Sequence, residues 1–243
     1  MSQPKAIVIG ASRGIGQGLV KKLASEGYDA YGTIRSEPTD DHTFQVDLND
    51  SDAASVKKAA SNFDSLDLLI VSGALAYATS YSEISPDEHR SFYNTNVIGP
   101  LAAAQAFLPA LKKGKQKTIV IISSLAGSTG FQLQNARQPA DKKLPLGKGP
   151  YSATKAAVNQ LGIGLYNELG SEGFSVMLVH PGVVRTDMAA SFIKNLESKP
   201  DSPIKAITVE ESTNGIIDVV KSHIATGKSD IRLVSYDGTD MAT

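Results

Sequence analysis

Short apolar runs alternate with longer amphipathic stretches along the chain, and this alternation constrains the fold more than any other feature. The run at 6–9 reads Ala-Ile-Val-Ile, and the run at 118–123 reads Thr-Ile-Val-Ile-Ile-Ser. Continuous apolar runs of this length are typical of parallel strands that helices cover on both faces. The sequence therefore predicts an α/β fold, with a doubly wound parallel sheet of about seven strands.

The individual elements follow from the same pattern. We expect strands at 6–9, 29–34, 43–46, 67–72, 118–123, 174–179 and 230–234. We expect helices at 13–26, 49–63, 85–111, 151–172 and 208–226. Pro100 and Pro109 predict breaks or bends in the third of these helices. The sequence has no repeat or linker, so residues 1–243 are expected to form a single domain.

Composition excludes several classes of function. Lys and Arg number 24 and Asp and Glu number 25, so the formal net charge is −1 and a nucleic-acid or anionic-membrane partner is not expected. The chain has no cysteine, which excludes disulfides, zinc–thiolate sites and a cysteine nucleophile, and we expect no metal. No run approaches the ~18 apolar residues of a membrane span. We expect a soluble, cytoplasmic protein.

A glycine-rich loop joins the first expected strand to the first helix. It reads Gly10-Ala11-Ser12-Arg13-Gly14-Ile15-Gly16. Glycines at a strand-to-helix turn allow the backbone to approach a pyrophosphate, and the amino end of the helix attracts the anion. The loop therefore predicts a dinucleotide site. The alternative is a tight turn that only packs the helix on the strand.

The same loop also fits Gly-x-Ser-x-Gly, the nucleophile elbow of serine hydrolases, with Ser12 at its centre. That interpretation predicts ester cleavage without a nicotinamide cofactor. It gives no role to Gly16 or to the tyrosine and lysine described below.

Two arginines indicate which dinucleotide is preferred. Arg13 lies within the glycine loop, and Arg35 directly follows the second expected strand. An acidic residue at that position holds the ribose 2′-hydroxyl of NAD, whereas arginine favours the 2′-phosphate of NADP. Glu37 is close enough to fill the NAD role. We expect NADP(H) rather than NAD(H), because Arg35 comes first and Arg13 can reinforce it.

A tyrosine and a lysine lie four residues apart at the start of the fourth expected helix. Tyr151 and Lys155 therefore share one helix face. An ammonium beside a phenol favours the phenolate, so we expect Lys155 to lower the pKa of Tyr151. A tyrosine tuned in this way can exchange a proton near neutral pH. The alternative is an ordinary surface pair.

Further polar residues are expected near this pair. Ser123 and Ser124 end a strand, and the carboxyl ends of parallel strands line the ligand crevice, where a serine can bind a carbonyl oxygen. Asn96 lies inside the long helix at 85–111, where asparagine is a poor helix former and is expected to make a polar contact. The alternatives are a serine pair that starts a loop and a buried amide with satisfied hydrogen bonds.

In these motifs the chain resembles the short-chain dehydrogenases/reductases, over essentially its whole length. The resemblance implies a Rossmann-type sheet and catalytic roles for Asn96, Ser124, Tyr151 and Lys155, the last two also contacting the cofactor. Ser124 is preferred over Ser123 because it directly precedes Leu-Ala-Gly. The cofactor contacts that the resemblance and the loop analysis predict are Gly10, Ser12, Arg13, Gly14, Ile15, Gly16, Arg35, Asp47, Leu48, Gly73, Pro181, Gly182, Val183 and Thr186. Several stretches look most like the carbonyl-reductase-like branch, which includes C-factor and sniffer proteins.

The sequence departs from the family in two places. Val71-Ser72-Gly73-Ala74 stands where the family has Asn-Asn-Ala-Gly, so a bracing asparagine is lost and the close approach to the cofactor is expected to fall to Gly73. Ser124 and Tyr151 are 27 positions apart (151 − 124), which is longer than usual. We expect the extra residues, within 127–150, to form an inserted loop near the substrate site.

The resemblance implies hydride transfer between a nicotinamide and a carbonyl or alcohol carbon, with Tyr151 as general acid or base. A small, apolar or aromatic substrate is expected, because Leu75, Tyr77, Phe131, Met188 and Phe192 lie in segments expected to flank the site. A homodimer or homotetramer is also implied. The main alternative is a non-catalytic dinucleotide sensor or scaffold, which would not need the four catalytic residues.

Overall fold

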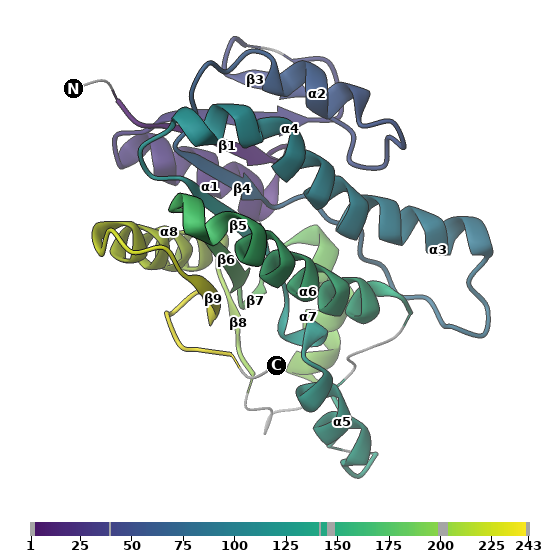
Figure 1. Cartoon of the computed structure of the whole chain (residues 1–243). Helices are drawn as coiled ribbons and strands as arrows, with labels where there is room; N and C mark the ends of the chain where they lie inside the picture. Colours follow the sequence, from purple (N-terminus) through teal and green to yellow (C-terminus); the bar gives the residue numbers. More distant parts are fainter. Residues whose placement is uncertain (1–2, 39, 141, 145–148, 199–203, 242–243) are drawn as a thin grey trace.

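The computed structural model describes residues 3–38, 40–140, 142–144, 149–198 and 204–241. Its central sheet has seven parallel strands in the order β3-β2-β1-β4-β5-β6-β9 (Figure 1). They are β1 (Lys5–Ile9), β2 (Asp29–Ile34), β3 (Thr43–Gln45), β4 (Leu68–Val71), β5 (Thr118–Ile122), β6 (Ser175–His180) and β9 (Ile231–Ser235). This confirms the predicted single-domain, doubly wound fold of Rossmann type.

Helices cover both faces of the sheet, as the continuous apolar strands require (Figure 1). On one face, α1 (Gly14–Ser25) and α8 (Val209–Ala225) pack against each other and on a core that includes Val8 and Met177. The other face carries α2 (Ala54–Ala60), α4 (Gly99–Lys113) and α6 (Tyr151–Leu169). All five residues of β5 are buried between these layers. The sheet is therefore a rigid platform for the groups at its ends.

The helix expected at 85–111 is interrupted, although not at either proline. It consists of α3 (Pro86–Tyr93), a π-helical turn η1 (Asn94–Ile98) and α4. Pro100 lies in the first turn of α4, where a missing N–H costs little, and Pro109 lies inside α4. The helix is therefore irregular, as expected, at a π turn that ends two residues before Pro100, whereas Pro109 lies inside α4 without an interruption.

The segment at 127–150 is not simply the inserted loop that we expected. After a 3-10 turn η2 (Leu125–Gly127), residues Thr129–Arg137 form the helix α5. The Ser128 hydroxyl caps this helix by accepting from the Phe131 N–H at 3.1 Å, which explains why it starts there. Residues 141 and 145–148 lie outside the described residues, so the rest of the expected loop is only partly seen.

Smaller elements were not expected from the sequence. They are η3 (Gly170–Glu172), β7 (Val183–Val184), η4 (Asp187–Ala189), α7 (Ala190–Glu197) and β8 (Ala206–Ile207). Also, α2 begins later than predicted, because the Asp50 carboxylate accepts from the Asp52 and Ser55 N–H groups and holds a turn ahead of the helix. None of the described helices is both long and apolar enough to cross a membrane.

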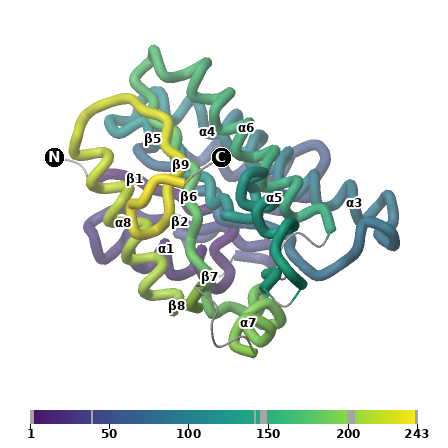
Figure 2. Tube along the Cα trace, turned by 90° about the horizontal axis from the view of Figure 1, so that it is seen from below, coloured from purple at the N-terminus to yellow at the C-terminus, as the bar shows by residue number. Residues whose placement is uncertain are grey.

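The connections define a switch point between β1 and β4. The chain leaves β1 toward β2 and β3 on one side, and continues from β4 toward β5 and β6 on the other. Ligands of such sheets bind outside the carboxyl ends of the strands at this point. The segments that follow β5 and β6 on that edge carry α5 and α7, which lie together at the lower end of Figure 1 and are seen from below in Figure 2.

Candidate active site

The glycine loop lies against the end of β4. Gly10 has a φ of +86°, and a Cβ there would come within 2.5 Å of the Gly73 Cα. A Cβ at Gly16 would come within 2.0 Å of the Gly10 carbonyl oxygen. Only glycine fits at these positions, so the loop is a tight turn that brings the amino end of α1 to the switch point.

The amino end of α1 leaves hydrogen-bond donors free. In contrast to α3 and α8, which both begin with a capping box, α1 has no side-chain cap and no acidic residue in its first turn within the described part of the chain. Unpaired N–H groups and a positive helix end together favour an anion. The loop therefore fits the pyrophosphate of a dinucleotide.

Predicted cofactor residues from distant parts of the chain meet at this loop. A Cβ at Gly14 would lie 3.2 Å from Thr186 Cγ2, which places Thr186 beside the glycine loop. Arg13 in the glycine loop forms an exposed ion pair at 3.0 Å with Asp187, the residue after Thr186. Sequence reasoning missed Asp187 as the partner of Arg13.

Other predicted cofactor contacts line the same region. Leu48 is buried, and its Cδ1 is 2.8 Å from where a Cβ at Gly73 would be. The Asp47 carboxylate accepts from the Asn49 N–H at 2.9 Å, and Arg35 is exposed directly after β2. The remaining predicted contacts lie in or beside these turns: Ser12 and Ile15 in the glycine loop, and Pro181, Gly182 and Val183 after β6.

Lys155 and Tyr151 meet Ser124 at the carboxyl end of β5. The buried Lys155 Nζ donates to the Ile122 carbonyl oxygen at 2.7 Å and lies 5.7 Å from the centre of the Tyr151 ring. Burial lowers the pKa of Lys155 to about 8. Burial raises the pKa of Tyr151, and a side-chain hydrogen bond with Ser124 opposes this rise. Three of the four residues predicted to be catalytic are thus adjacent.

The direction of the Tyr151 pKa shift differs from our expectation. We expected the lysine to lower the pKa of the phenol, but the pKa is raised because desolvation of the phenolate is the largest effect. Lys155 lies over the ring, and its ammonium donates to a backbone carbonyl. The i, i+4 spacing gives proximity and says nothing about how deeply the pair is buried.

The two serines at the end of β5 have different surroundings. The Ser123 hydroxyl is buried and donates to the Asn159 Oδ1 at 2.5 Å. Ser124 is only half-buried, and its hydroxyl accepts from the Ala126 N–H at 3.1 Å. Ser124 interacts with Tyr151, whereas Ser123 anchors α6 to the sheet. The geometry therefore favours Ser124 as the serine of the site.

Asn96 occupies the middle of the π turn and is 1% exposed. Its amide bonds both the N–H and the carbonyl of Leu75, at 2.7 and 2.9 Å, and donates to Thr154 Oγ1 at 3.0 Å. Asn96 thus ties the segment after Gly73 to the first turn of α6. Val71, which replaces the family's asparagine, packs in the apolar core instead.

Besides Asp187, sequence reasoning missed the side chain of His180 near the site. His180 ends β6, and its Nδ1 accepts from the Leu125 N–H at 3.3 Å, in the turn that follows Ser124. The signal available was the position of His180 at the end of an apolar strand beside Pro181 and Gly182.

The hydrolase alternative lacks its base. Within the described residues, no hydrogen bond joins Ser12 to any of the four histidines. His42 pairs with Asp29, His89 packs against Tyr93, His180 accepts from Leu125, and His223 bonds Ser175. A nucleophilic serine needs a histidine within hydrogen-bond reach. The loop therefore favours the phosphate-binding interpretation.

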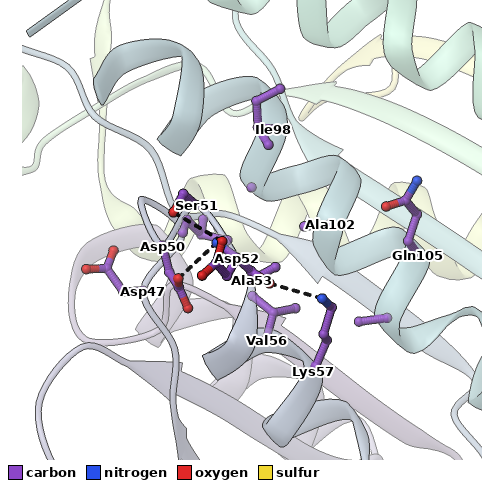
Figure 3. Close-up of a pocket in the computed structure, with 13 residues that line it drawn as sticks. Asp47, Asp50, Ser51, Asp52, Ala53, Val56, Lys57, Ile98, Ala102 and Gln105 are labelled. Atoms are coloured by element: carbon purple, nitrogen blue, oxygen red, sulfur yellow. Dashed lines mark hydrogen bonds between the residues drawn. The ribbon is translucent and has the colours of Figure 1, made fainter. Parts of the chain in front are cut away.

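A pocket of roughly 360 Å³ lies between α2 and α4, beside Asp47 and Leu48 (Figure 3). Its rim is acidic, and Lys57 donates to the Asp52 carbonyl oxygen at 3.0 Å. None of the four predicted catalytic residues lines this pocket. It is thus separate from the catalytic group.

Among the residues expected to flank the substrate, the contacts of Tyr77 and the exposure of Met188 are informative. Tyr77 packs against Phe92, with ring centres 4.8 Å apart, and its hydroxyl donates to Glu88 at 3.4 Å. Met188 is 47% exposed in η4, directly after Asp187. The structure thus leaves an apolar side chain accessible on the segment beside the glycine loop.

Comparisons with known proteins agree with this geometry. Residues 4–197 match the family model of the short chain dehydrogenases. An uncharacterized oxidoreductase of Schizosaccharomyces pombe is 31% identical, and the alignment covers 96% of this chain and 95% of the relative. The NADPH-bound carbonyl reductase from chicken fatty liver superposes with a TM-score of 0.79 at 25% identity, over the whole of both chains.

A further solved structure, the carbonyl reductase Sniffer of D. melanogaster, has a TM-score of 0.77 at 23% identity, over all of both chains, and shares the fold. These findings confirm the predicted resemblance, including its carbonyl-reductase-like branch. The chain belongs to the short-chain dehydrogenase family of oxidoreductases.

Proposed function

We propose that this oxidoreductase uses NADP(H) to interconvert a carbonyl and an alcohol, with Tyr151 as the general acid or base. The observation that carries the proposal is the meeting of Tyr151, Lys155 and Ser124 at the carboxyl end of β5, on the sheet edge that holds the glycine loop. A proton donor and a phosphate cradle on one edge suit redox chemistry on a C–O bond.

The roles of the chain's own groups follow from their chemistry. When bound, the nicotinamide supplies or accepts the hydride. The Ser124 hydroxyl orients and polarises the substrate oxygen, and the Tyr151 hydroxyl transfers a proton to that oxygen. Lys155 supports the phenol and holds the ribose. Asn96 fixes the first turn of α6 through Thr154 and orders a water that resupplies the proton.

The pKa shifts favour carbonyl reduction. Because burial raises the pKa of Tyr151, the phenol keeps its proton at neutral pH and is ready to donate it. The pKa of Lys155, about 8, lies near neutrality, so this amine can take up and release protons during turnover. General acid catalysis of this kind contributes ~10²–10⁴-fold to the rate.

The preference for NADP(H) rests on Arg35 and Arg13. Arg35 is exposed after β2, at the position that selects between a ribose hydroxyl and a phosphate. Arg13 is paired with Asp187, so it would exchange this carboxylate for the 2′-phosphate when it binds the cofactor. The chicken carbonyl reductase, which has NADPH bound, supports this preference by similarity.

The substrate that we propose is a small apolar or aromatic ketone, aldehyde or the corresponding alcohol. Apolar residues in the segments after β4 and β6, Tyr77 and Met188, support this choice. We further propose a homodimer or homotetramer in the cytoplasm. The groove between α4 and α6, which includes Leu108 and Leu161, offers an apolar face for a second copy.

Turnover tests the proposal. Purified protein is mixed with NADPH or NADH and a panel of ketones, aldehydes, diketones and quinones, and absorbance is followed at 340 nm. Tyr151→Phe should lower kcat by at least about 100-fold, while NADPH still binds in a fluorescence titration. Tyr28→Phe is the matched control, because the Tyr28 hydroxyl donates to Gln116 at the opposite edge of the sheet.

Two outcomes would contradict the proposal. Unchanged turnover in Tyr151→Phe would remove the tyrosine from the mechanism. Cofactor binding without turnover of any panel member would favour a dinucleotide sensor or scaffold, the non-catalytic alternative.

A further inference from the structure

The side chain of His180 links two strands at the edge that carries the site. His180 is the last residue of β6, and β6 lies beside β5 in the sheet. The histidine is fixed through its own backbone, because its carbonyl oxygen accepts from the Tyr236 N–H at 2.8 Å. Its ring accepts from the N–H of Leu125, the residue directly after Ser124, at 3.3 Å.

The turn that follows Ser124 satisfies its other N–H groups internally. The Ala126 N–H donates to the Ser124 hydroxyl at 3.1 Å, and the Gly127 N–H donates to the Ser124 carbonyl at 2.9 Å. The Ser128 N–H donates to the Leu125 carbonyl at 3.0 Å. The Leu125 N–H therefore depends on His180, and an unpaired half-buried donor would favour rearrangement of the turn.

A displacement of this turn would move Ser124 relative to the phenol. On its far side the turn touches α6 so closely that a Cβ at Gly127 would lie 2.7 Å from the Lys155 carbonyl carbon. The turn is thus held between α6 on one side and His180 on the other. Loss of the histidine would leave one of these two supports.

We propose that His180 is a positioning residue that fixes the Ser124 hydroxyl relative to Tyr151 through the Leu125 N–H. This inference rests on the proposed function, in which Ser124 binds the substrate oxygen. A misplacement of about 1 Å in such a group can lower the rate by roughly 100-fold.

The hydrogen bond also fixes the tautomer of His180. Because Nδ1 accepts, it has no proton, and the proton of the neutral ring is on Nε2. Burial lowers the pKa of His180 to about 4, and the charge of Asp237 opposes this shift. The ring is therefore neutral at the pH of any ordinary assay, and Nδ1 keeps its acceptor role.

Three substitutions test the inference, because they differ in where they place an acceptor. His180→Phe keeps a ring but removes the acceptor. His180→Asn places its Oδ1 near the position of Nδ1, whereas His180→Gln places an oxygen farther out. We expect kcat for the best panel substrate to fall about 10- to 100-fold in the Phe and Gln variants. His180→Asn should stay within about three-fold of the wild type.

Two further readouts separate positioning from loss of structure. The Kd for NADPH should change little in all three variants, because the backbone at His180 and Pro181 is held by the Tyr236 N–H and the Ser212 hydroxyl, which the substitutions leave in place. His223→Phe is the matched control: His223 is a buried histidine that bonds Ser175 at 2.8 Å at the opposite sheet edge. Its loss should lower Tm and leave the kcat of the folded fraction unchanged.

The inference would be overturned by an unchanged kcat in His180→Phe, or by Asn and Gln variants that are equally impaired. If the Phe variant does not fold, the comparison of Asn with Gln decides. Failure of the proposed function looks different, because the wild-type protein would then show no nicotinamide oxidation at all.

Discussion

The two edges of the sheet use polar side chains in opposite ways. At the amino edge, the Asp67 carboxylate accepts from the Lys5 and Lys115 N–H groups, at 2.9 and 2.8 Å. There too, the Ser175 hydroxyl bonds His223 at 2.8 Å and the Lys228 carbonyl at 3.1 Å. Both of these polar groups close loops onto the sheet.

At the carboxyl edge, the buried ammonium of Lys155 keeps hydrogen-bond donors free within the described part of the chain. An ammonium has three donors, and Lys155 uses one of them on the Ile122 carbonyl. Burial lowers the pKa of the Lys155 ammonium to about 8, which costs folding free energy at neutral pH, whereas burial raises the pKa of the Tyr151 phenol, which is uncharged at that pH and costs none. The amino edge therefore stabilises the fold, and the carboxyl edge gives up stability to keep reactive groups available.

The largest expected effect contrasts one serine from each edge. Ser124→Ala should lower kcat by about 100-fold, as expected when a donor to a developing oxyanion is lost, with only a small change in Tm. Ser175→Ala should lower Tm clearly, because it leaves buried partners such as His223 unpaired, and should leave kcat unchanged. Steady-state kinetics and thermal melts on both variants measure this, and equal kinetic losses would break the comparison.

The next largest effect is expected from a charge reversal at Arg35, which should change the preference between NADPH and NADH. Arg35→Asp should shift the ratio of kcat/KM values with NADPH and NADH toward NADH by about 10-fold or more, because the carboxylate repels a 2′-phosphate and can bind the ribose hydroxyl. Lys112→Asp makes the same change of charge at the amino edge, where Lys112 pairs with Glu172 at 2.9 Å. An unchanged ratio in Arg35→Asp, or an equal shift in the control, would count against the assignment.

The smallest expected effect is a rise in stability. The pKa of Lys155 is about 8 in the folded chain and about 10.4 when unfolded, so burial of the ammonium destabilises the fold fully below pH 8. Lys155→Met should therefore raise Tm by a few degrees at pH 7 while abolishing turnover.

The gain in Tm from this substitution should shrink as the pH rises from about 8 and vanish above about 10.4. Lys117→Met is the control at the amino edge, where the ammonium of this half-buried residue donates to the Glu172 carbonyl oxygen at 3.1 Å. If Tm does not rise in Lys155→Met at pH 7, then the interactions of the buried ammonium offset the free-energy cost of its desolvation.

Most of the sheet could be predicted because each strand is a short apolar run bounded by turn residues. The helices α5 and α7 could not, because they are short and their positions depend on local context such as the Ser128 cap. The π turn at 94–98 has no sequence signature beyond an asparagine in an unfavourable place.

The site divides in a similar way. The proximity of Tyr151 and Lys155 follows from helical spacing alone, and their neighbours follow from the family resemblance. The contact between His180 and Leu125 joins residues 55 positions apart, and only the pairing of β5 with β6 brings them together. The pKa of Tyr151 could not be predicted either, because it depends on burial, which helical spacing does not reveal.

The π turn makes the region around Asn96 sensitive to deletion more than to substitution. A π turn holds its wider loop of backbone by i to i+5 hydrogen bonds, so removal of a single residue from 94–98 would restore an ordinary α-helix. The narrower turn would absorb the lost residue, so the displacement would be concentrated on the residues of the turn itself, Asn96 among them. Asn96 would lose its hydrogen bonds to the Leu75 backbone, and the segment after β4 would no longer be held to this helix.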